Sequence, residues 1–420
     1  MTVEVTRLPS GLTVATETMP TIETAAVQVW VHAGSRLERP EEGGIAHVLE
    51  HMAFKGTIRR TAVEIKEELA SVGGFISAAT STDDTIYGAR MLKPDVPLAL
   101  DILSDILINP VFDPQELTRE EGVIVHEIAA RQDNPNGVTI ERLMATAYPD
   151  QPLGRPIAGT PASVRSFSRD SLIAYRARTY HAPNTVVTVA GAVEHQAVVA
   201  EVTTRFAAMQ AISVAKPAPG RFNPGTATIE RTIEQLHFAA ALPGRAVTDS
   251  ARRSLQIFGH ILGGDMSSRL FHEAREKRGL CYAIGAAHWE WGDTGLFVIY
   301  AATDPERITP LMEVIGDEVR AATENISEVE VARAKAQFKS GMLMAMETAV
   351  ARAGSMAEDI LVRGRPTTLQ EFAADVDAVT VESVRAVGRD VITRTPPAIT
   401  ALGPRQGLDP VAASGNPFRQ

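Results

Sequence analysis

Residues 43–57 read GGIAHVLEHMAFKGT and place His47, Glu50 and His51 in the order H-x-x-E-H. Residues three and four positions apart share one face of an α-helix, so the two imidazoles and the carboxylate would project together. Histidines at i and i+4 are spaced to bind one metal ion, and the carboxylate between them can act on a metal-bound water. The stretch therefore predicts a helix that carries two metal ligands and a base.

A catalytic zinc site usually takes three protein ligands, and a second helix offers candidates for the third. The helix predicted from Pro114 to about Arg131 carries Glu120 and, two turns later, Glu127 on the same face. His126 points about 100° away around a helix of 3.6 residues per turn, so it cannot join that cluster. Acidic residues are numerous in this chain, so Glu127 is only the best of several candidates. The motif could also be two surface histidines beside a solvated glutamate.

The composition is that of an ordinary soluble protein. The 420 residues are 45% hydrophobic and 22% charged, and this length favours two or more domains. The net charge of -10, from 41 Lys and Arg against 51 Asp and Glu, disfavours nucleic-acid and anionic-membrane partners. It fits peptide substrates that carry basic residues.

The cellular compartment can be predicted from what the chain lacks. Cys281 is the only cysteine, which excludes an intrachain disulfide and favours a reducing compartment. Residues 1–17 show neither a signal-peptide core nor an amphipathic presequence, and no apolar run approaches the ~20 residues that span a bilayer. We therefore expect a cytoplasmic protein of bacterial type, without a membrane partner. The alternative is a protein of an organelle matrix in its mature form.

The order of predicted elements repeats after a linker. Residues 211–225 contain three prolines and two glycines and show little periodicity, as in an interdomain linker. Landmarks at Pro94, Asp113 and Ser168 recur at Pro305, Ser327 and Thr380, at offsets of 211, 214 and 212 positions. A nearly constant offset predicts a duplicated domain.

The predicted elements give an α+β fold of two tandem homologous domains. In each, helices pack on a sheet rich in antiparallel strands. The predicted domains are 1–210, which carries the metal motif, and 226–405. We expect 406–420 to be a flexible tail. Strands are predicted at 12–19, 25–33, 75–80, 85–91, 185–190, 227–233, 236–241, 280–288, 295–302 and 398–401. Helices are predicted at 61–72, 96–108, 114–131, 138–147, 168–180, 194–209 and 249–262.

HVLEHMAFKGT, followed by EEGVIVHEI with Glu127 placed 76 positions after His51, resembles the pitrilysin family of zinc peptidases. H-x-x-E-H is the inverted zinc-peptidase signature, that of the inverzincins. Within the family the chain is similar to the short branch that includes the mitochondrial processing peptidase and its bacterial relatives. The resemblance implies that His47, His51 and Glu127 bind one zinc ion per chain. It makes Glu50 the general base and gives Glu120 a supporting role.

Two further stretches carry the resemblance. LGGDMSSRLFHEAREKRGLCYAIG is similar to the family's C-terminal motif, in which an arginine and a tyrosine lie seven positions apart, here Arg275 and Tyr282. A guanidinium and a phenol can donate hydrogen bonds to a substrate carbonyl and its developing oxyanion. Alone, Arg275 would be solvated charge and Tyr282 a half-buried strand residue. The second stretch is the strand edge Ser77, Ala78, Ala79 and Thr80, which we expect to bind substrate backbone by β-augmentation. It has Ser77 where the family commonly has asparagine.

The function predicted from the resemblance is that of a zinc-dependent endopeptidase. It would hydrolyse unfolded peptides or presequences through a zinc-bound water activated by Glu50. The alternatives are a non-catalytic scaffold or partner subunit of the same family, and a metal-binding protein without turnover. The resemblance also implies that two chains face each other as halves of a clamshell. We hypothesise a homodimer whose active sites are completed in trans.

Overall fold

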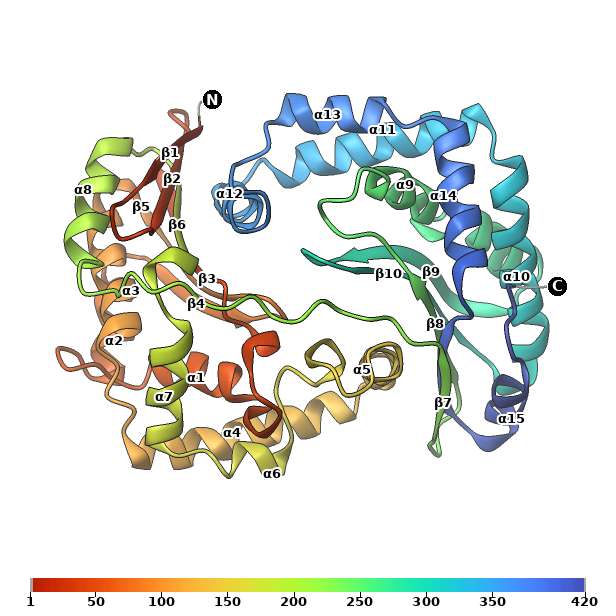
Figure 1. The fold of residues 1–420 in the computed structure, drawn as a ribbon, viewed down its shortest axis with the longest axis horizontal. Helices are drawn as coiled ribbons and strands as arrows, with labels where there is room; N and C mark the ends of the chain where they lie inside the picture. Colours follow the sequence, from red (N-terminus) through yellow and green to blue (C-terminus); the bar gives the residue numbers. More distant parts are fainter. Residues whose placement is uncertain (1–2, 419–420) are drawn as a thin grey trace. The chain divides into compact units, whose positions relative to one another are not determined.

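The protein, a computed structural model that describes residues 3–418, divides into two compact units. Unit 1 comprises the chain up to Ala129 together with Arg155–Ala218 and Leu343–Thr367. Unit 2 comprises Ala130–Gly154, Pro219–Met342 and the chain from Thr368. Each unit contains one mixed sheet covered by helices, as the sequence predicts (Figure 1).

The elements of unit 1 lie near the ranges expected from hydrophobic periodicity and caps. Its strands are β1 (Val3–Arg7), β2 (Thr13–Thr18), β3 (Thr24–Val31), β4 (Phe75–Thr80), β5 (Thr85–Leu92) and β6 (Thr185–Gly191). Its helices are α1 (Ile45–Ala53), α2 (Ala62–Ser71), α3 (Val96–Ile108), most of α4 (Pro114–Gln132), α6 (Pro161–Val164), α7 (Arg169–Thr179), α8 (His195–Arg205) and α12 (Ala349–Arg363).

Unit 2 likewise combines one sheet with several helices. Its strands are β7 (Gly225–Glu230), β8 (Leu236–Pro243), β9 (Cys281–Glu290), β10 (Gly295–Thr303) and β11 (Ala398–Gly403). Its helices are α5 (Pro135–Ala147), α9 (Arg252–Gly263), α10 (Ile308–Asn325), most of α11 (Glu328–Ala345), α13 (Leu369–Asp377), α14 (Val381–Arg394) and α15 (Arg405–Ala413), with a π-helix at Phe271–Lys277.

The two sheets have the same topology, which confirms the duplication. The strand order is β1-β2-β6-β3-β5-β4 in unit 1 and β7-β11-β8-β10-β9 in unit 2. Apart from the extra edge strand β1, each strand of one sheet has a counterpart at the same place in the other. The first pair, β2 with β6 or β7 with β11, is parallel, and the following pairs are antiparallel.

The central strand β3 is covered on both faces. Val27, Val29 and Val31 join the main core of unit 1, built with α1, α3, α7 and α8. On the opposite face, Ala26 packs in a cluster with α12, and the Gln28 amide donates a hydrogen bond to the carbonyl of Val350 at 3.1 Å. This burial explains the almost continuous apolar run in the sequence of this strand.

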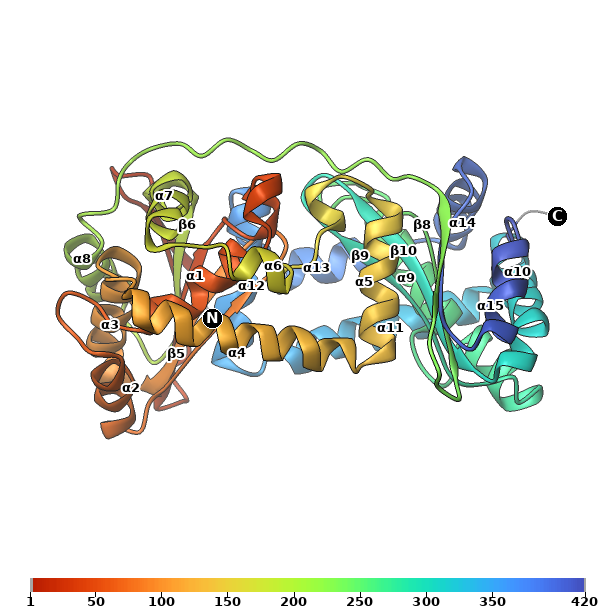
Figure 2. The ribbon, with the colours of Figure 1, turned by 90° about the horizontal axis from the view of Figure 1, so that it is seen from below.

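One helix of each half of the sequence belongs to the other unit. Helix α12, which follows the linker in sequence, covers β2, β3 and β6 with Ala353, Met356 and Ile360. Helix α5, which precedes the linker, packs on β7, β8 and β11 with Leu143 and Ala147 (Figure 2). The compact units therefore differ from the predicted contiguous domains 1–210 and 226–405. The apolar face of a helix can be read from the sequence, but the sequence does not show which of two similar sheets that face covers.

The prediction of a flexible tail from residue 406 is wrong. Helix α15 buries Leu408 and Val411 against β7 and β11, and Phe418 is also buried. The spacing of this apolar pair favours a helix although Pro410 lies inside it. Residues 419–420 of the predicted tail lie outside the described residues. Among residues 3–418, no helix has both the length and the apolar character needed to cross a membrane.

Candidate active site

The start of α1, the helix that carries H-x-x-E-H, is bound by the buried carboxyl group of Glu38, which lies earlier in the chain. Glu38 accepts hydrogen bonds from the backbone N–H groups of Gly44 and Ala46, both at 3.0 Å. Burial raises the pKa of Glu38 to about 8, although these two hydrogen bonds and the charge of Arg155 oppose the rise. Gly44 has a φ of 96°, and a Cβ there would lie 2.8 Å from the carbonyl oxygen of Ala158. The sharp entry into the helix therefore requires glycine.

His47 and His51 meet Glu127 of α4. One ligand atom from each of the three residues lies within 4.8 Å of the other two. Nε2 of His47 and Nε2 of His51 are each 3.8 Å from Oε2 of Glu127. His126, next to Glu127, is exposed. Among the described residues no other group of three His, Cys, Asp or Glu side chains has this arrangement.

The three residues fit a zinc ion by chemistry and spacing. Two imidazoles and one carboxylate form a donor set known from catalytic zinc sites, with bonds of about 2.0–2.2 Å. Such bonds separate neighbouring ligand atoms by roughly 3.3 Å in a tetrahedral site. Each histidine nitrogen lies 3.8 Å from Glu127 and all three ligand atoms lie within 4.8 Å of one another, so side-chain rotations would bring them to bonding distance. His47 is buried, whereas His51 and Glu127 are partly exposed. The cluster is therefore supported by the core on one side and accessible on the other.

Glu50 lies one residue before His51 and is held by the neighbouring sheet. The hydroxyl of Thr80, the last residue of β4, donates a hydrogen bond to Glu50 Oε2 at 2.5 Å. Burial raises the pKa of Glu50, and the hydrogen bond from Thr80 and the charge of His51 oppose that rise only in part. A carboxyl group with a raised pKa beside a candidate metal-binding cluster is suited to proton transfer.

Glu120 is buried on α4 and contacts the candidate ligand His51. Its Oε2 lies 3.0 Å from Nδ1 of His51, and its Oε1 pairs with the ammonium group of Lys55. Burial alone would raise the pKa of Glu120, but the hydrogen bonds with Lys55 and His51 and their charges lower it overall. Glu120 therefore contacts a candidate ligand and does not join the ligand cluster.

Strand β4 has the open edge expected for substrate binding. Within residues 3–418 it lies at the end of the sheet and has β5 as its one partner strand. Ser77 and Ala79 are exposed, whereas Ala78 and Thr80 are partly buried. The strand thus has an unpaired edge next to Glu50, and unpaired backbone groups can bind an extended chain.

Arg275 and Tyr282 contact each other in unit 2. The Arg275 guanidinium lies 5.2 Å from the centre of the Tyr282 ring and 4.6 Å from that of Phe271. Arg275 is part of the π-helix, an element that occurs frequently at functional sites. Tyr282 is 73% exposed and lines a cavity of about 240 Å³ together with Gln235 and Arg307. Tyr282 is therefore available to an external group, whereas Arg275 is partly buried beside it.

Sequence reasoning missed three contacts of this site. Glu38 supports the start of α1, Thr80 binds Glu50, and Lys55 binds Glu120. Lys55 follows His51 by four positions, and this helical spacing was the only available signal. The contacts of Glu38 and Thr80 depend on chain reversals that no local pattern specifies.

Comparison with known proteins places the chain in a family. The model for insulinase (peptidase family M16) matches residues 13–161, and that for the peptidase M16 inactive domain matches residues 166–338. An "uncharacterized zinc protease" of Rickettsia felis is 36% identical, over 89% of this chain and 92% of that protein. A probable mitochondrial-processing peptidase subunit beta of Arabidopsis thaliana is 35% identical, over 96% of this chain and 79% of that protein.

Solved structures show the same fold. A peptidase M16 inactive domain from Pseudomonas fluorescens superposes with a TM-score of 0.89 at 21% identity, covering 96% of this chain and 98% of that one. A protease from Helicobacter pylori gives 0.88 at 22% identity, covering 96% and 99%. The sequence matches extend over both halves of the chain, and the relatives named as zinc proteases cover most of it. The chain belongs to peptidase family M16, which confirms the predicted resemblance.

Proposed function

We propose that this chain is a zinc-dependent endopeptidase that hydrolyses unfolded peptides or presequences. The observation that supports this most is the convergence of His47, His51 and Glu127 beside Glu50. In the proposal these three ligands hold one zinc ion per chain. Zinc, when bound, supplies Lewis-acid activation of a water molecule and of a peptide carbonyl.

Glu50 is the general base of the proposed reaction. The Thr80 hydroxyl holds this carboxyl group in place, and the group accepts a proton from the attacking water. The same carboxyl group can return that proton to the amine that leaves when the peptide C–N bond breaks. The raised pKa of Glu50 suits a group that both accepts and returns a proton.

The edge of β4 selects extended substrates in this proposal. A peptide that adds as a further strand must expose its backbone over several residues, which a folded protein rarely does. The net charge of -10 adds a preference for basic peptides. Folded proteins should therefore survive an incubation that degrades their unfolded forms, and equal cleavage of both would contradict this substrate class.

Arg275 and Tyr282 stabilise the substrate carbonyl in the proposal, as donors to the developing oxyanion. We propose that they act on the zinc centre of a second chain in a homodimer. The proposed zinc ligands belong to unit 1, whereas Arg275 and Tyr282 belong to unit 2. In this model the chain works in the cytoplasm, since a single cysteine suits a reducing compartment.

A peptide library with and without chelator tests the function. We expect the purified zinc-loaded chain to cleave library peptides, and chelation to stop cleavage until zinc is restored. The alternative is a non-catalytic scaffold or partner subunit. A chain that binds zinc and cleaves nothing in the library would support that alternative and contradict the proposal.

A further inference from the structure

Lys55 lies in the turn after α1 and reaches back to the site through Glu120. Its ammonium group pairs with Glu120 Oε1, while Glu120 Oε2 lies 3.0 Å from Nδ1 of His51. Each carboxylate oxygen thus has its own partner, which fixes the plane of the group. A carboxylate that accepts from Nδ1–H leaves Nε2 of the imidazole for a metal.

The pair of Lys55 and Glu120 is shielded from water. The exposed fractions of the two side chains are 20% and 8%. Most ion pairs of Lys with acidic groups on protein surfaces hold their partners weakly, because both side chains remain hydrated and mobile. Because the pair of Lys55 and Glu120 is shielded from water, the position of the Glu120 carboxylate depends on Lys55.

The backbone around Lys55 is anchored to the end of α3. The carbonyl of Gly56 accepts from the N–H of Val111 at 3.1 Å, and the N–H of Ile58 donates to the carbonyl of Asn109 at 3.1 Å. Gly56 has a φ of 120°, which the chain reversal requires. The turn therefore has a defined path.

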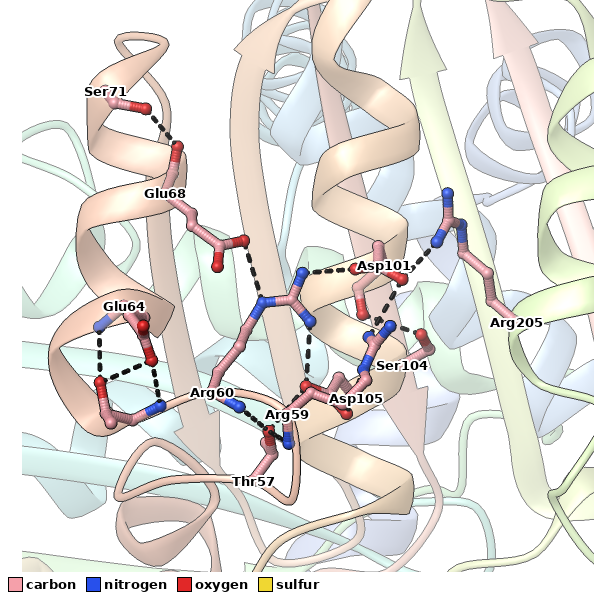
Figure 3. A network of polar contacts seen from close by, with 11 residues as sticks. Thr57, Arg59, Arg60, Glu64, Glu68, Ser71, Asp101, Ser104, Asp105 and Arg205 are labelled. Carbon is pink, nitrogen blue, oxygen red and sulfur yellow. Dashed lines mark hydrogen bonds and ion pairs between the residues drawn. The ribbon is translucent and has the colours of Figure 1, made fainter.

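Side chains complete this anchor, which we call the α3 anchor and define as Thr57, Arg59, Arg60, Asp101 and Asp105. The Thr57 hydroxyl donates to Asp105 Oδ2 at 2.7 Å, and the Asp105 side chain is fully buried. Figure 3 shows that the guanidinium groups of Arg59 and Arg60 both bridge Asp101 and Asp105. Charge-assisted hydrogen bonds to the buried Asp105 and its neighbour Asp101 fix this turn, and with it the position of Lys55.

We infer that Lys55 is a positioning residue of the candidate metal centre: held by the α3 anchor, it fixes Glu120, which orients His51 for the metal. The inference rests on the proposed zinc site. The continuous contacts from Asp105 through Thr57 to the turn, and from Lys55 through Glu120 to His51, carry it. The role of Lys55 is to set the affinity and geometry of the site without touching the metal or the substrate.

The test measures metal binding directly. Apo-protein of the wild type and of Lys55→Met, Lys55→Arg and Lys93→Met is titrated with zinc against a chromogenic chelator. Lys93→Met is the matched control, because Lys93 forms an ion pair with Glu23 in the same unit but both side chains are largely exposed. Visible spectra of the cobalt-loaded proteins report the ligand geometry.

We expect Lys55→Met to weaken zinc binding by about 10- to 100-fold, as for other partners of metal-bound histidines, and to alter the cobalt spectrum. Lys55→Arg, which keeps the charge, should stay within a few-fold of the wild type, and Lys93→Met should not differ from it. If Lys55→Met does not fold, Lys55→Gln replaces it with the same expectation. Unchanged zinc affinity in the uncharged variant would overturn the role of Lys55 alone. A wild-type chain that binds no zinc would overturn the proposed function and this inference together.

Discussion

The hydroxyl of Thr80 donates to Oε2 of Glu50 at 2.5 Å and so links the last residue of an edge strand to the proposed base in α1. We predict that Thr80→Val lowers kcat by about 10- to 100-fold, the range of one hydrogen bond to a charged group, because Glu50 loses its orientation. KM and zinc content should change little. Thr80→Ser keeps the hydroxyl and should retain most of the activity. If the valine variant is as active as the serine variant, Thr80 does not orient the base.

Glu50→Gln should keep zinc and lose hydrolysis. The amide is nearly isosteric with the carboxylate but cannot accept a proton from water. Since general-base catalysis contributes about 10²- to 10⁴-fold, turnover should fall below about a hundredth of the wild type. Zinc content and peptide turnover are measured on the same preparation. Faster turnover by a zinc-loaded variant would show that another group is the base.

Loss of a proposed ligand should lower metal affinity directly. We expect His47→Ala, His51→Ala and Glu127→Ala each to release zinc at chelator concentrations that the wild type withstands, because a site with three protein ligands retains only two. His126→Ala is the matched control, since this exposed histidine lies next to Glu127. If Glu127→Ala binds zinc as tightly as the control, the third ligand lies elsewhere, and Glu120 is the first alternative.

Mixing two inactive variants tests whether sites are completed in trans. Glu50→Gln and Tyr282→Phe chains should each be inactive alone. In a mixed homodimer, one site would combine an intact Glu50 with an intact Tyr282 of the other chain, so activity should reappear. Subunit exchange is followed independently with two affinity tags. Exchange without recovered activity would contradict completion in trans.

The buried carboxyl group of Glu38 should make stability depend on pH. Its folded-state pKa is raised to about 8 from an ordinary value of 4.5. Between these values the folded chain retains a proton that the unfolded chain has released, so the free energy of unfolding decreases as pH rises, by at most about 1.4 kcal/mol per pH unit. Glu38→Gln carries no titrating proton and should remove this part of the slope.

Urea midpoints of the wild type and of Glu38→Gln between pH 5 and 8 check this expectation. The difference between them should shift in favour of the variant as pH rises. Glu64→Gln is the control, because Glu64 is exposed at the start of α2 and its pKa is lowered by hydrogen bonds from Thr61. A constant difference for Glu38→Gln across this range would show that Glu38 does not retain its proton.

Much of this protein could be predicted because its signals are local. Strand β4 and helix α3 have the predicted bounds, and Asp113 accepts from the N–H groups of Gln115 and Glu116 as the predicted cap of α4. The convergence of the metal motif with Glu127 was implied only by family resemblance, since 76 residues separate Glu127 from His51 and local periodicity does not bring them together.

The remaining differences depend on tertiary contacts. Helices α12 and α13 were not predicted, and the π-helix at Phe271–Lys277 has no distinct periodicity in its sequence. Helix α15 was not predicted either. The spacing of Leu408 and Val411 alone is a weak signal for a helix, and their burial depends on contacts with β7 and β11. Thr80 was predicted as a residue of the substrate edge, yet its hydroxyl contacts Glu50. Side-chain partners of this kind depend on packing between distant segments.

The exchange of α5 and α12 means that the duplicated halves are no longer separable modules. A fragment that ends in the linker would retain α5 without the strands that cover Leu143 and Ala147, and would lack α12 over β2, β3 and β6. The complementary fragment would retain α12 without β2, β3 and β6, and would lack α5 over β7, β8 and β11. Each would expose apolar surface until it met the other, so the two fragments should regain their folds only when expressed together. A chimaera in which one half of the chain is replaced must therefore bring, within the new half, a helix that packs on the sheet of the half that is kept.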